Sequence, residues 1–446
     1  MKSNIFLITI DSLRVDRISS MTKSSFTPNI DKLIKNGTFF LKTISTSDAT
    51  GTSIGSIFSG CFPFQTGINH FNYNEKIPMF SDILKENNYF LSSTTPDVSF
   101  FLKLTSNFDK NFSYVYDKRE NWLQLDGGIG DKIVDELNSL KGKMPWFYYV
   151  HLMDLHSPFK LPLKFQSTKF GLTSYDQMIS YIDVWLGRFF EQINFEETIV
   201  ILSADHGDYI PIHDMTFNYN DNFQKFLRKG KKIFPQLEPL GVKLFEKTKL
   251  IERNQKLNKM KNQLSEKDFR TLGMRGDVSL FDELLLTPLI MSGKKIPKSK
   301  SINAMVRQVD IFPTILDLID VEISIKTLHG RSLFALIKDE KIEELPAYIE
   351  TGTRNPKKLG KLIGIRTSKY KFLRTRSLDE THFTLFDLQN DPDEENNIAN
   401  NNPEICTKMN ELLSTLKKES TPLSKKELST SEEHEIEEEL KKLGYM

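Results

Sequence analysis

Two apolar segments that each end in an aspartate constrain the fold of this chain most strongly. The segment Thr198–Ala204 is an uninterrupted, largely β-branched run, and Asp205 and His206 follow it directly. Such a run is typical of a strand that is buried on both faces of a parallel sheet. A second run, Asn4–Ile10, ends at Asp11 in the same way. Because ligands bind beyond the carboxyl ends of such strands, we expect Asp11, Asp205 and His206 to lie close together.

These three side chains predict a site for a divalent cation, because carboxylates and imidazole are common ligands of such ions. The alternative is that each aspartate only caps the helix that follows its strand, which is a common role for Asp. The repetition of the unit, and the histidine next to Asp205, favour the cation site.

The order of segments predicts an α/β fold, in which a mixed, mostly parallel sheet lies between layers of helices. Trp146–Leu152 has the composition of another buried strand, and Thr27–Asn36 has the pattern of a capped amphipathic helix. From about residue 346 short strands alternate with turns, which predicts a small antiparallel sheet. Its expected strands are Ala347–Thr351, Gly364–Phe372 and Phe383–Asp387.

We expect three regions: a catalytic α/β domain over residues 1–340, a C-terminal α+β subdomain over 341–418 and a charged helical tail over 419–446. Residues 222–272 are rich in lysine and arginine and predict a helical insertion in the first domain. This insertion is either a solvated helical segment or a basic surface that draws in an anionic substrate or partner.

Composition limits the location and the partners of the protein. The chain has 446 residues and only two cysteines, so we expect no disulfide framework. The net charge of +1 argues neither for nor against a polyanionic partner, and we expect no nucleic-acid partner. No apolar run approaches the roughly 18 residues of a membrane span. A strand beginning at Asn4 leaves no room for a signal peptide before it. We therefore expect a cytoplasmic protein without a transmembrane segment, and the sequence leaves an oligomer open.

Small hydroxyl residues are concentrated between Ser47 and Gly60, where the pattern becomes helical. A Thr or Ser at a helix start meets exposed backbone N–H groups and the positive end of the helix dipole. That environment suits an oxyanion and favours an alkoxide, particularly when a cation coordinates the oxygen. The alternative is an ordinary loop or helix cap.

A series of short motifs in order, from residue 4 to about residue 415, resembles the sulfatase branch of the alkaline phosphatase superfamily. The resemblance implies that family's fold. The motifs are Asp11–Arg17, Thr27–Asp31, Gly37–Phe40, Ser59–Pro63, Thr66–Ile68, His151–Phe159, Asp205–Asp208, Leu280–Glu283, Val309–Thr314, His329–Leu333, Ile365–Thr367 and Leu385–Glu394.

The family's spacing places the nucleophile at Thr50. Sulfatases proper carry a Cys or Ser there, in a Cys/Ser-x-Pro-x-Arg signature, and convert it to formylglycine. Here Thr50–Ile54 has neither the Pro nor the Arg, and the similar-looking Cys61–Gln65 falls after the helix. We therefore interpret Cys61 as structural. Thr50 resembles the nucleophile of the phosphate-handling relatives, which form a phosphothreonine. A further departure is Ser12, where many sulfatases have a second Asp ligand.

The resemblance also implies a role for each remaining site residue. One divalent cation, Mg²⁺, Mn²⁺, Ca²⁺ or Zn²⁺, would be held by Asp11, Asp205, His206 and the Thr50 oxygen. Candidates to protonate the leaving group or bind a substrate oxygen are His156 and His213, since imidazole can donate near neutral pH. Substrate-binding cations would be Arg14 and Arg275, whereas His151 is expected to be a satisfied core histidine. The alternatives are an ordinary loop residue for His213 and a surface charge for Arg275.

The predicted function is metal-dependent hydrolysis or transfer of phosphate or sulfate esters through a covalent threonine intermediate, with phosphoesters favoured. The alternatives are a sulfatase with an atypical nucleophile and a non-catalytic binding protein with the same fold. The expected substrate is an anionic small molecule, a glycan ester or a lipid-headgroup ester.

Overall fold

The computed structural model describes residues 2–115, 124–143, 145–156, 159–210, 267, 270, 280–322, 328–352, 362–376 and 382–418. The chain forms two compact units, Met1–Asp208 with Val278–Met446, and Tyr209–Asp277. The predicted site residues His213 and Arg275 lie outside the described residues, as do the tail 419–446 and nearly all of the basic segment 222–272. The structure described below belongs to the first unit.

A mixed, mostly parallel sheet forms the centre of this unit, in the order β4-β3-β5-β1-β6-β7-β2-β8. The strand β7 is antiparallel to both of its neighbours, and all other adjacent strands are parallel. The strands are β1 (Asn4–Ile10), β2 (Gly37–Ile44), β3 (Phe90–Pro96), β4 (Lys110–Tyr114), β5 (Trp146–Leu152), β6 (Thr198–Ala204), β7 (Leu286–Gly293) and β8 (Lys300–Arg307). The predicted α/β class is confirmed.

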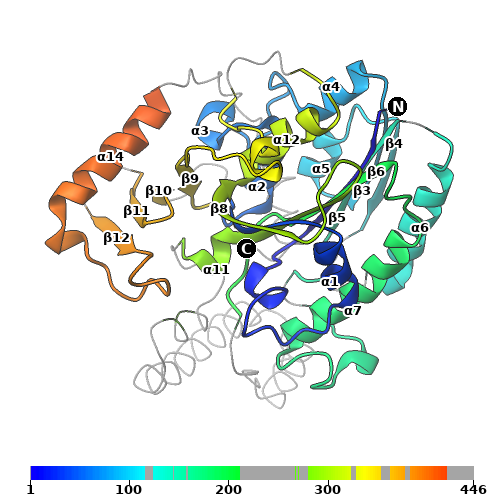
Figure 1. Cartoon of the computed structure of the whole chain (residues 1–446), viewed down its shortest axis with the longest axis horizontal. Coiled ribbons are helices and arrows are strands. Elements are labelled where there is room, and N and C mark those ends of the chain that lie inside the picture. Colours follow the sequence, from blue (N-terminus) through cyan, green and yellow to red (C-terminus); the bar gives the residue numbers. More distant parts are fainter. Residues whose placement is uncertain are drawn as a thin grey trace, which may run out of the picture. The chain divides into compact units, whose positions relative to one another are not determined.

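Helices cover both faces of this sheet (Figure 1). One face carries α1 (Pro28–Lys35), α6 (Gly130–Ser139) and α7 (Ser174–Phe190). The other face carries α2 (Thr50–Ser59), α4 (Phe80–Glu86) and α12 (Ile311–Leu318). Shorter helices are α3 (Pro63–Thr66), α5 (Ser99–Leu104), α11 (Asp282–Leu285) and α13 (Phe334–Ile337). Among the described helices, none combines the length and the apolar character that a membrane crossing requires.

The central strands are buried on both faces, as their apolar composition predicts. Every residue of β1, β5 and β6 is buried. In the parallel register Ile10 lies beside both Leu152 and Ala204. Asp11 and Asp205 therefore leave the sheet at the same edge and from adjacent strands.

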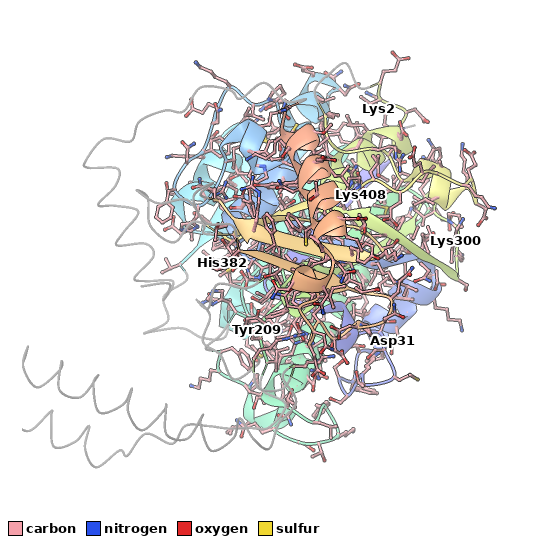
Figure 2. All side chains as sticks on the ribbon, turned by 90° about the vertical axis from the view of Figure 1, so that its left-hand side faces the viewer. Lys2, Asp31, Tyr209, Lys300, His382 and Lys408 are labelled. Carbon is pink, nitrogen blue, oxygen red and sulfur yellow. The ribbon has the colours of Figure 1, made fainter. Side chains whose placement is uncertain are left out.

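A second, four-stranded antiparallel sheet follows in the order β12-β11-β10-β9. Its strands are β9 (Ala347–Glu350), β10 (Leu362–Arg366), β11 (Tyr370–Thr375) and β12 (Phe383–Asp387). The helix α14 (Pro403–Lys418) lies across this sheet (Figure 2). Apolar side chains of the helix and the sheet form one core, which includes Ile363, Ile365, Phe372, Leu385, Met409 and Leu413.

The single strand expected over Gly364–Phe372 is wrong in detail, because the chain turns between β10 and β11. Thr367 makes the turn: its hydroxyl oxygen accepts hydrogen bonds from the N–H groups of Lys369 (3.3 Å) and Tyr370 (2.9 Å). This side-chain bonding competes with the strand ladder and reverses the chain.

The second sheet is joined to the elements that carry the predicted site. Glu350 N–H donates to the Thr46 carbonyl (2.9 Å), and Ser47 forms an isolated bridge with Glu350. Both contacts lie just before α2. A buried ionic cluster adds a second connection, since Lys371 pairs with Asp282 (2.5 Å) and Glu394 (2.5 Å).

Candidate active site

The two carboxylates at the sheet edge are fully buried and are oriented by one residue between them. Ser12 donates its hydroxyl to Asp11 Oδ1 (2.5 Å) and its backbone N–H to Asp205 Oδ1 (3.0 Å). Its positive φ of 64° aims both donors at the carboxylates. Asp205 Oδ2 makes no hydrogen bond with any described residue, whereas Asp11 Oδ2 accepts one from Thr50.

Thr50 is the first residue of α2, and its side chain reaches this edge. Thr50 Oγ1 lies 3.1 Å from Asp11 Oδ2 and donates a hydrogen bond to it. Gly51 allows the backbone at His70 to pack against the start of α2, because a Cβ at Gly51 would lie only 2.7 Å from the backbone of His70. The threonine therefore combines a carboxylate partner with the positive end of a helix dipole, an environment that favours an oxyanion.

Two histidines approach the carboxylates from the two strands that flank β1: His151 lies on β5, and His206 follows β6. His206 Nδ1 lies 2.7 Å from the Gly207 carbonyl oxygen, which can only accept, so Nδ1 carries the proton. The lone pair is then on His206 Nε2, which lies 3.5 Å from Asp205 Oδ2. His151, on β5, contacts the Thr9 hydroxyl through Nδ1 (2.7 Å), and its Nε2 lies 3.9 Å from Asp11 Oδ2.

The chemistry of these groups fits a divalent cation. One ligand atom each from Asp11, His151 and Asp205 lie within 4.8 Å of one another. His151 Nε2 and Asp205 Oδ2 are buried and make no hydrogen bond with any described residue. Buried polar atoms without a partner are rare in folded proteins, and a bound cation would satisfy both. Burial lowers the pKa of His151 to about 4 despite the nearby Asp11, which leaves the neutral imidazole that a metal needs.

Sequence reasoning missed His151, which was expected to have its hydrogen bonds satisfied inside the core. Only one of its ring nitrogens has a hydrogen-bond partner among the described residues. A polar residue next to the end of a buried strand, one strand away from Asp11, was the available signal.

Gln308 was also missed, and it acts on the backbone of the site. Its amide nitrogen donates to the carbonyl oxygens of Ala204 (2.7 Å) and Asp205 (2.8 Å). Ser45 donates its hydroxyl to the same Asp205 carbonyl (2.7 Å). These contacts fix the turn that carries Asp205.

The other predicted residues are placed as follows. His156 is buried in the turn after β5, where its backbone N–H donates to the Met153 carbonyl (2.9 Å). Arg14 is also buried and makes a two-pronged contact with Asp16 (2.8 Å for each bond), while its Nη1 donates to the Asp208 carbonyl (3.2 Å). Burial disfavours the Arg14 charge, but Asp16, together with Glu283 and Tyr175, outweighs this effect and raises the pKa of Arg14. Its guanidinium is therefore already held by protein groups.

Cys61 lies at the far end of α2 from Thr50, beyond Gly60, which ends the helix in a left-handed conformation. At 1.5 Å per residue this separates the thiol from the helix start by roughly 15 Å. Burial raises the pKa of Cys61 to about 11. The thiol is thus protonated at neutral pH, which agrees with a structural role.

Comparison with known proteins identifies the family of this chain. Residues 3–321 match the Sulfatase family. The chain belongs to the sulfatase family. Residues 276–423 also match the family described as N-sulphoglucosamine sulphohydrolase, C-terminal. The sulfatase family is one of ester hydrolases, and the predicted superfamily is thereby confirmed.

Curated relatives of this sulfatase-family chain are distant. Arylsulfatase K of Gallus gallus is 29% identical over 148 residues, which cover 31% of this chain and 27% of the relative. The match thus spans about a quarter of that protein. The low-salt glycan biosynthesis sulfotransferase Agl7 of Haloferax volcanii is 22% identical over 371 residues, covering 78% of this chain and 72% of the relative.

Solved structures of similar fold cover nearly the whole chain. Ps i-CgsB in complex with k-i-k-neocarrahexaose has a TM-score of 0.66 at 17% identity and covers 100% of both chains. The phosphonate monoester hydrolase of Agrobacterium radiobacter has a TM-score of 0.67 at 15% identity, covering 94% of this chain and 96% of its own. At these identities the likeness establishes the fold.

Proposed function

We propose that this protein cleaves phosphate esters, by hydrolysis or by transfer to an acceptor, through a covalent intermediate on Thr50. The observation that carries the proposal is the position of Thr50 Oγ1. It stands at the N-terminus of a ten-residue helix, 3.1 Å from Asp11 Oδ2, at the edge where Asp205 also ends its strand. The family match supports ester chemistry at this edge.

The residues that would hold a divalent cation are Asp11, Asp205, His206 and the Thr50 oxygen, with His151 as an additional nitrogen donor. The distances between their ligand atoms support this set. Such a cation, when bound, lowers the pKa of a coordinated hydroxyl and screens the charge of an anionic ester.

The protein groups would divide the reaction between them. The Thr50 hydroxyl loses its proton towards Asp11 Oδ2, its hydrogen-bond acceptor. The oxygen then attacks phosphorus in line, so that the Thr50 oxygen–phosphorus bond forms while the bond to the ester oxygen breaks. N–H groups at the start of α2 stabilise the charge on the phosphoryl oxygens. His156 or His213 supplies a proton to the departing alcohol, and water or an acceptor alcohol then releases the phosphoryl group.

Sulfate-ester hydrolysis is the second candidate, and the family membership itself favours it. Formylglycine chemistry requires a Cys or Ser at the nucleophile position, where this chain has Thr50. A sulfatase reaction would therefore need the unmodified threonine. Because sulfate and phosphate groups share a tetrahedral geometry, the same helix start could bind either.

The substrate class that fits is an anionic ester of a small molecule, a glycan or a lipid headgroup. A glycan is the ligand of one solved structure of similar fold. We also propose that residues 1–340 carry the chemistry, with 222–272 as an insertion, and that 341–418 form a supporting subdomain. A cytoplasmic location stays a prediction that cell fractionation tests.

An activity panel with matched variants tests the proposal. Aryl phosphate mono- and diesters, aryl phosphonates and aryl sulfates would be assayed with each candidate cation, using wild type, Thr50→Ala and Thr50→Ser. We expect metal-dependent phosphoester turnover that Thr50→Ala abolishes and Thr50→Ser partly retains, because serine keeps a hydroxyl. Sulfate-ester turnover that survives Thr50→Ala would contradict the assignment of the nucleophile.

A further inference from the structure

Two loops at the edge of the sheet expose an unusual number of large apolar side chains. The loop 18–26 connects the 3-10 turn Val15–Arg17 to α1, and the loop 159–172 leads from β5 to α7. They are named the docking loops here. Eight large hydrophobic side chains are exposed among the described residues, and four of them lie in these short segments: Met21 (104%), Phe26 (52%), Leu163 (85%) and Leu172 (75%).

The docking loops lie against each other and are anchored to the protein. Leu172 N–H donates to Ser24 Oγ (3.0 Å), which joins the two loops directly. Phe26 N–H donates to Ser180 Oγ (2.7 Å), and the same hydroxyl contacts the Phe170 carbonyl (2.5 Å). The exposed apolar side chains therefore project from loops with fixed backbones and from one region of the surface.

Aromatic packing also holds the loop 159–172 in place. The buried ring of Phe165 packs against Phe170 at 4.7 Å and against Tyr181 of α7 at 5.5 Å between ring centroids. Its neighbours Leu163 and Lys164 are exposed. The loop thus keeps one aromatic side chain in the core while it presents Leu163 to the outside.

The charge of the docking loops is of one sign. They contain Lys23, Lys160, Lys164 and Lys169, and neither loop contains an aspartate or a glutamate. Lys23 pairs with Asp31 at the start of α1 (2.5 Å). The other three lysines are exposed and lie in the same loop as Leu163 and Leu172. Apolar side chains beside lysines are the composition that binds the interface of a membrane with anionic lipids.

The location of these loops connects the surface with the site. Both follow strands whose carboxyl ends form the site edge: Asp11 follows β1, and His151 is the penultimate residue of β5. Figure 1 shows the two segments ahead of α1 and α7, on the face that these helices cover. Along the chain, the docking loops therefore follow the two strand ends that carry Asp11 and His151.

We propose that the docking loops bind a lipid surface with anionic headgroups, with Met21, Leu163 and Leu172 inserted among the lipids. The lysines supply the attraction to the headgroups, and the apolar side chains supply the insertion. A single protein partner is a poorer fit, because Lys160, Lys164 and Lys169 are interspersed with Leu163 and Leu172 along the loop. That the substrate is a headgroup ester rests on the function proposed above, whereas the binding itself does not.

Vesicle co-sedimentation of the full chain tests the proposal. Vesicles of phosphatidylcholine alone would be compared with vesicles that also contain phosphatidylglycerol. We expect binding to be at least tenfold stronger with phosphatidylglycerol and to weaken as salt rises, because salt screens the lysines. The triple variant Met21→Ser/Leu163→Ser/Leu172→Ser should lose at least tenfold in binding while its thermal midpoint stays unchanged.

A matched control carries the same kind of change elsewhere on the surface. Leu102→Ser/Val115→Ser/Leu412→Ser removes three other exposed apolar side chains, and it should bind vesicles as the wild type does. Equal losses in the two triple variants, or no binding by the wild type, would overturn the proposal. Light scattering that shows a wild-type dimer, abolished only by the docking-loop variant, would assign the surface to self-association instead.

The result can be separated from the fate of the proposed function. Turnover of a soluble aryl phosphate should be the same in the wild type and both triple variants. Vesicle binding without any aryl phosphate turnover would refute the proposed function and leave the docking surface intact. Turnover without vesicle binding would refute the docking surface and leave the proposed function intact.

Discussion

Replacing His151 by glutamine should change which cation the protein prefers. His151 Nε2 is buried, lies 3.9 Å from Asp11 Oδ2 and makes no hydrogen bond with a described residue. Glutamine has nearly the same reach but offers an oxygen in place of the ring nitrogen. Nitrogen ligands favour Zn²⁺ relative to Ca²⁺ and Mg²⁺, which prefer oxygen. The variant should therefore lose affinity for Zn²⁺ far more than affinity for Ca²⁺.

The size of the expected loss in zinc affinity follows from the removal of one ligand from a small set of metal ligands. Even residues that only support a metal ligand typically contribute a factor of about 10–100 in affinity. We therefore expect at least a tenfold loss for Zn²⁺, which corresponds to about 1.4 kcal/mol. Thr9→Val, which removes the hydroxyl beside His151 Nδ1 (2.7 Å), should give a smaller loss.

The assay is chelator competition on the apoprotein, with the exposed His382→Gln as the matched control. X-ray absorption of the zinc-loaded wild type, which should count two imidazole ligands, does not depend on whether the variant folds. Unchanged zinc affinity in His151→Gln, or a single imidazole in the spectrum, would refute the assignment of His151. If the wild type binds no divalent cation, the metal site itself is wrong.

Three further predictions concern stability and the rival nucleophile. Lys371→Met should lower the free energy of unfolding by about 3 kcal/mol, because it leaves the buried Asp282 and Glu394 without this cation. Chemical denaturation would measure this loss, and the control Lys408→Met, at an exposed position, should leave the free energy of unfolding nearly unchanged. Cys61→Ala should keep full ester turnover. In the wild type, Cys61 should react with a thiol reagent only after unfolding, because burial raises its pKa to about 11. A folded but inactive Cys61→Ala would indicate that Cys61 is the nucleophile. Burial raises the pKa of Asp183 to about 6, so the folded state holds an extra proton between pH 4 and pH 6, and the stability present below pH 4 is lost as pH rises through 6. The free energy of unfolding should fall by roughly 2–3 kcal/mol over this window, and a variant Asp183→Asn that keeps the full slope would contradict the assignment.

The buried strands could be read from the sequence almost residue by residue. Asn4–Ile10, Trp146–Leu152 and Thr198–Ala204 have the predicted bounds. A strand that is buried on both faces needs a continuous apolar run, and few other elements produce one. Topology then brings Asp11 and Asp205 to one edge without further information.

Elements with mixed burial were harder to predict. The strand β8 contains both exposed and buried residues, and it was not expected. The turn at Thr367 was missed because its cause is a side-chain hydrogen bond rather than a glycine or proline. The antiparallel direction of β7 depends on the path of the chain before it, and composition carries no signal for this.

The contacts of the candidate site were also only partly predictable from the sequence. The resemblance pointed to Thr50, and the structure places its hydroxyl beside Asp11. The position of His151 beside the two carboxylates depends on the ring orientation that Thr9 sets. The attachment of Arg14 to Asp16 likewise depends on a local turn. Sequence patterns give the order of residues, but these contacts are set by rotamers.

The central claim is that Thr50 becomes covalently modified during turnover. We would mix the metal-loaded enzyme with an aryl phosphate, quench in acid within the first turnover and map the phosphorylated residue by tandem mass spectrometry. The account predicts a phosphoryl group on Thr50, which is absent from Thr50→Ala and is formed fast enough to support the steady-state rate. A phosphoryl or sulfuryl group on any other residue, or turnover with an unmodified Thr50 throughout, would contradict it.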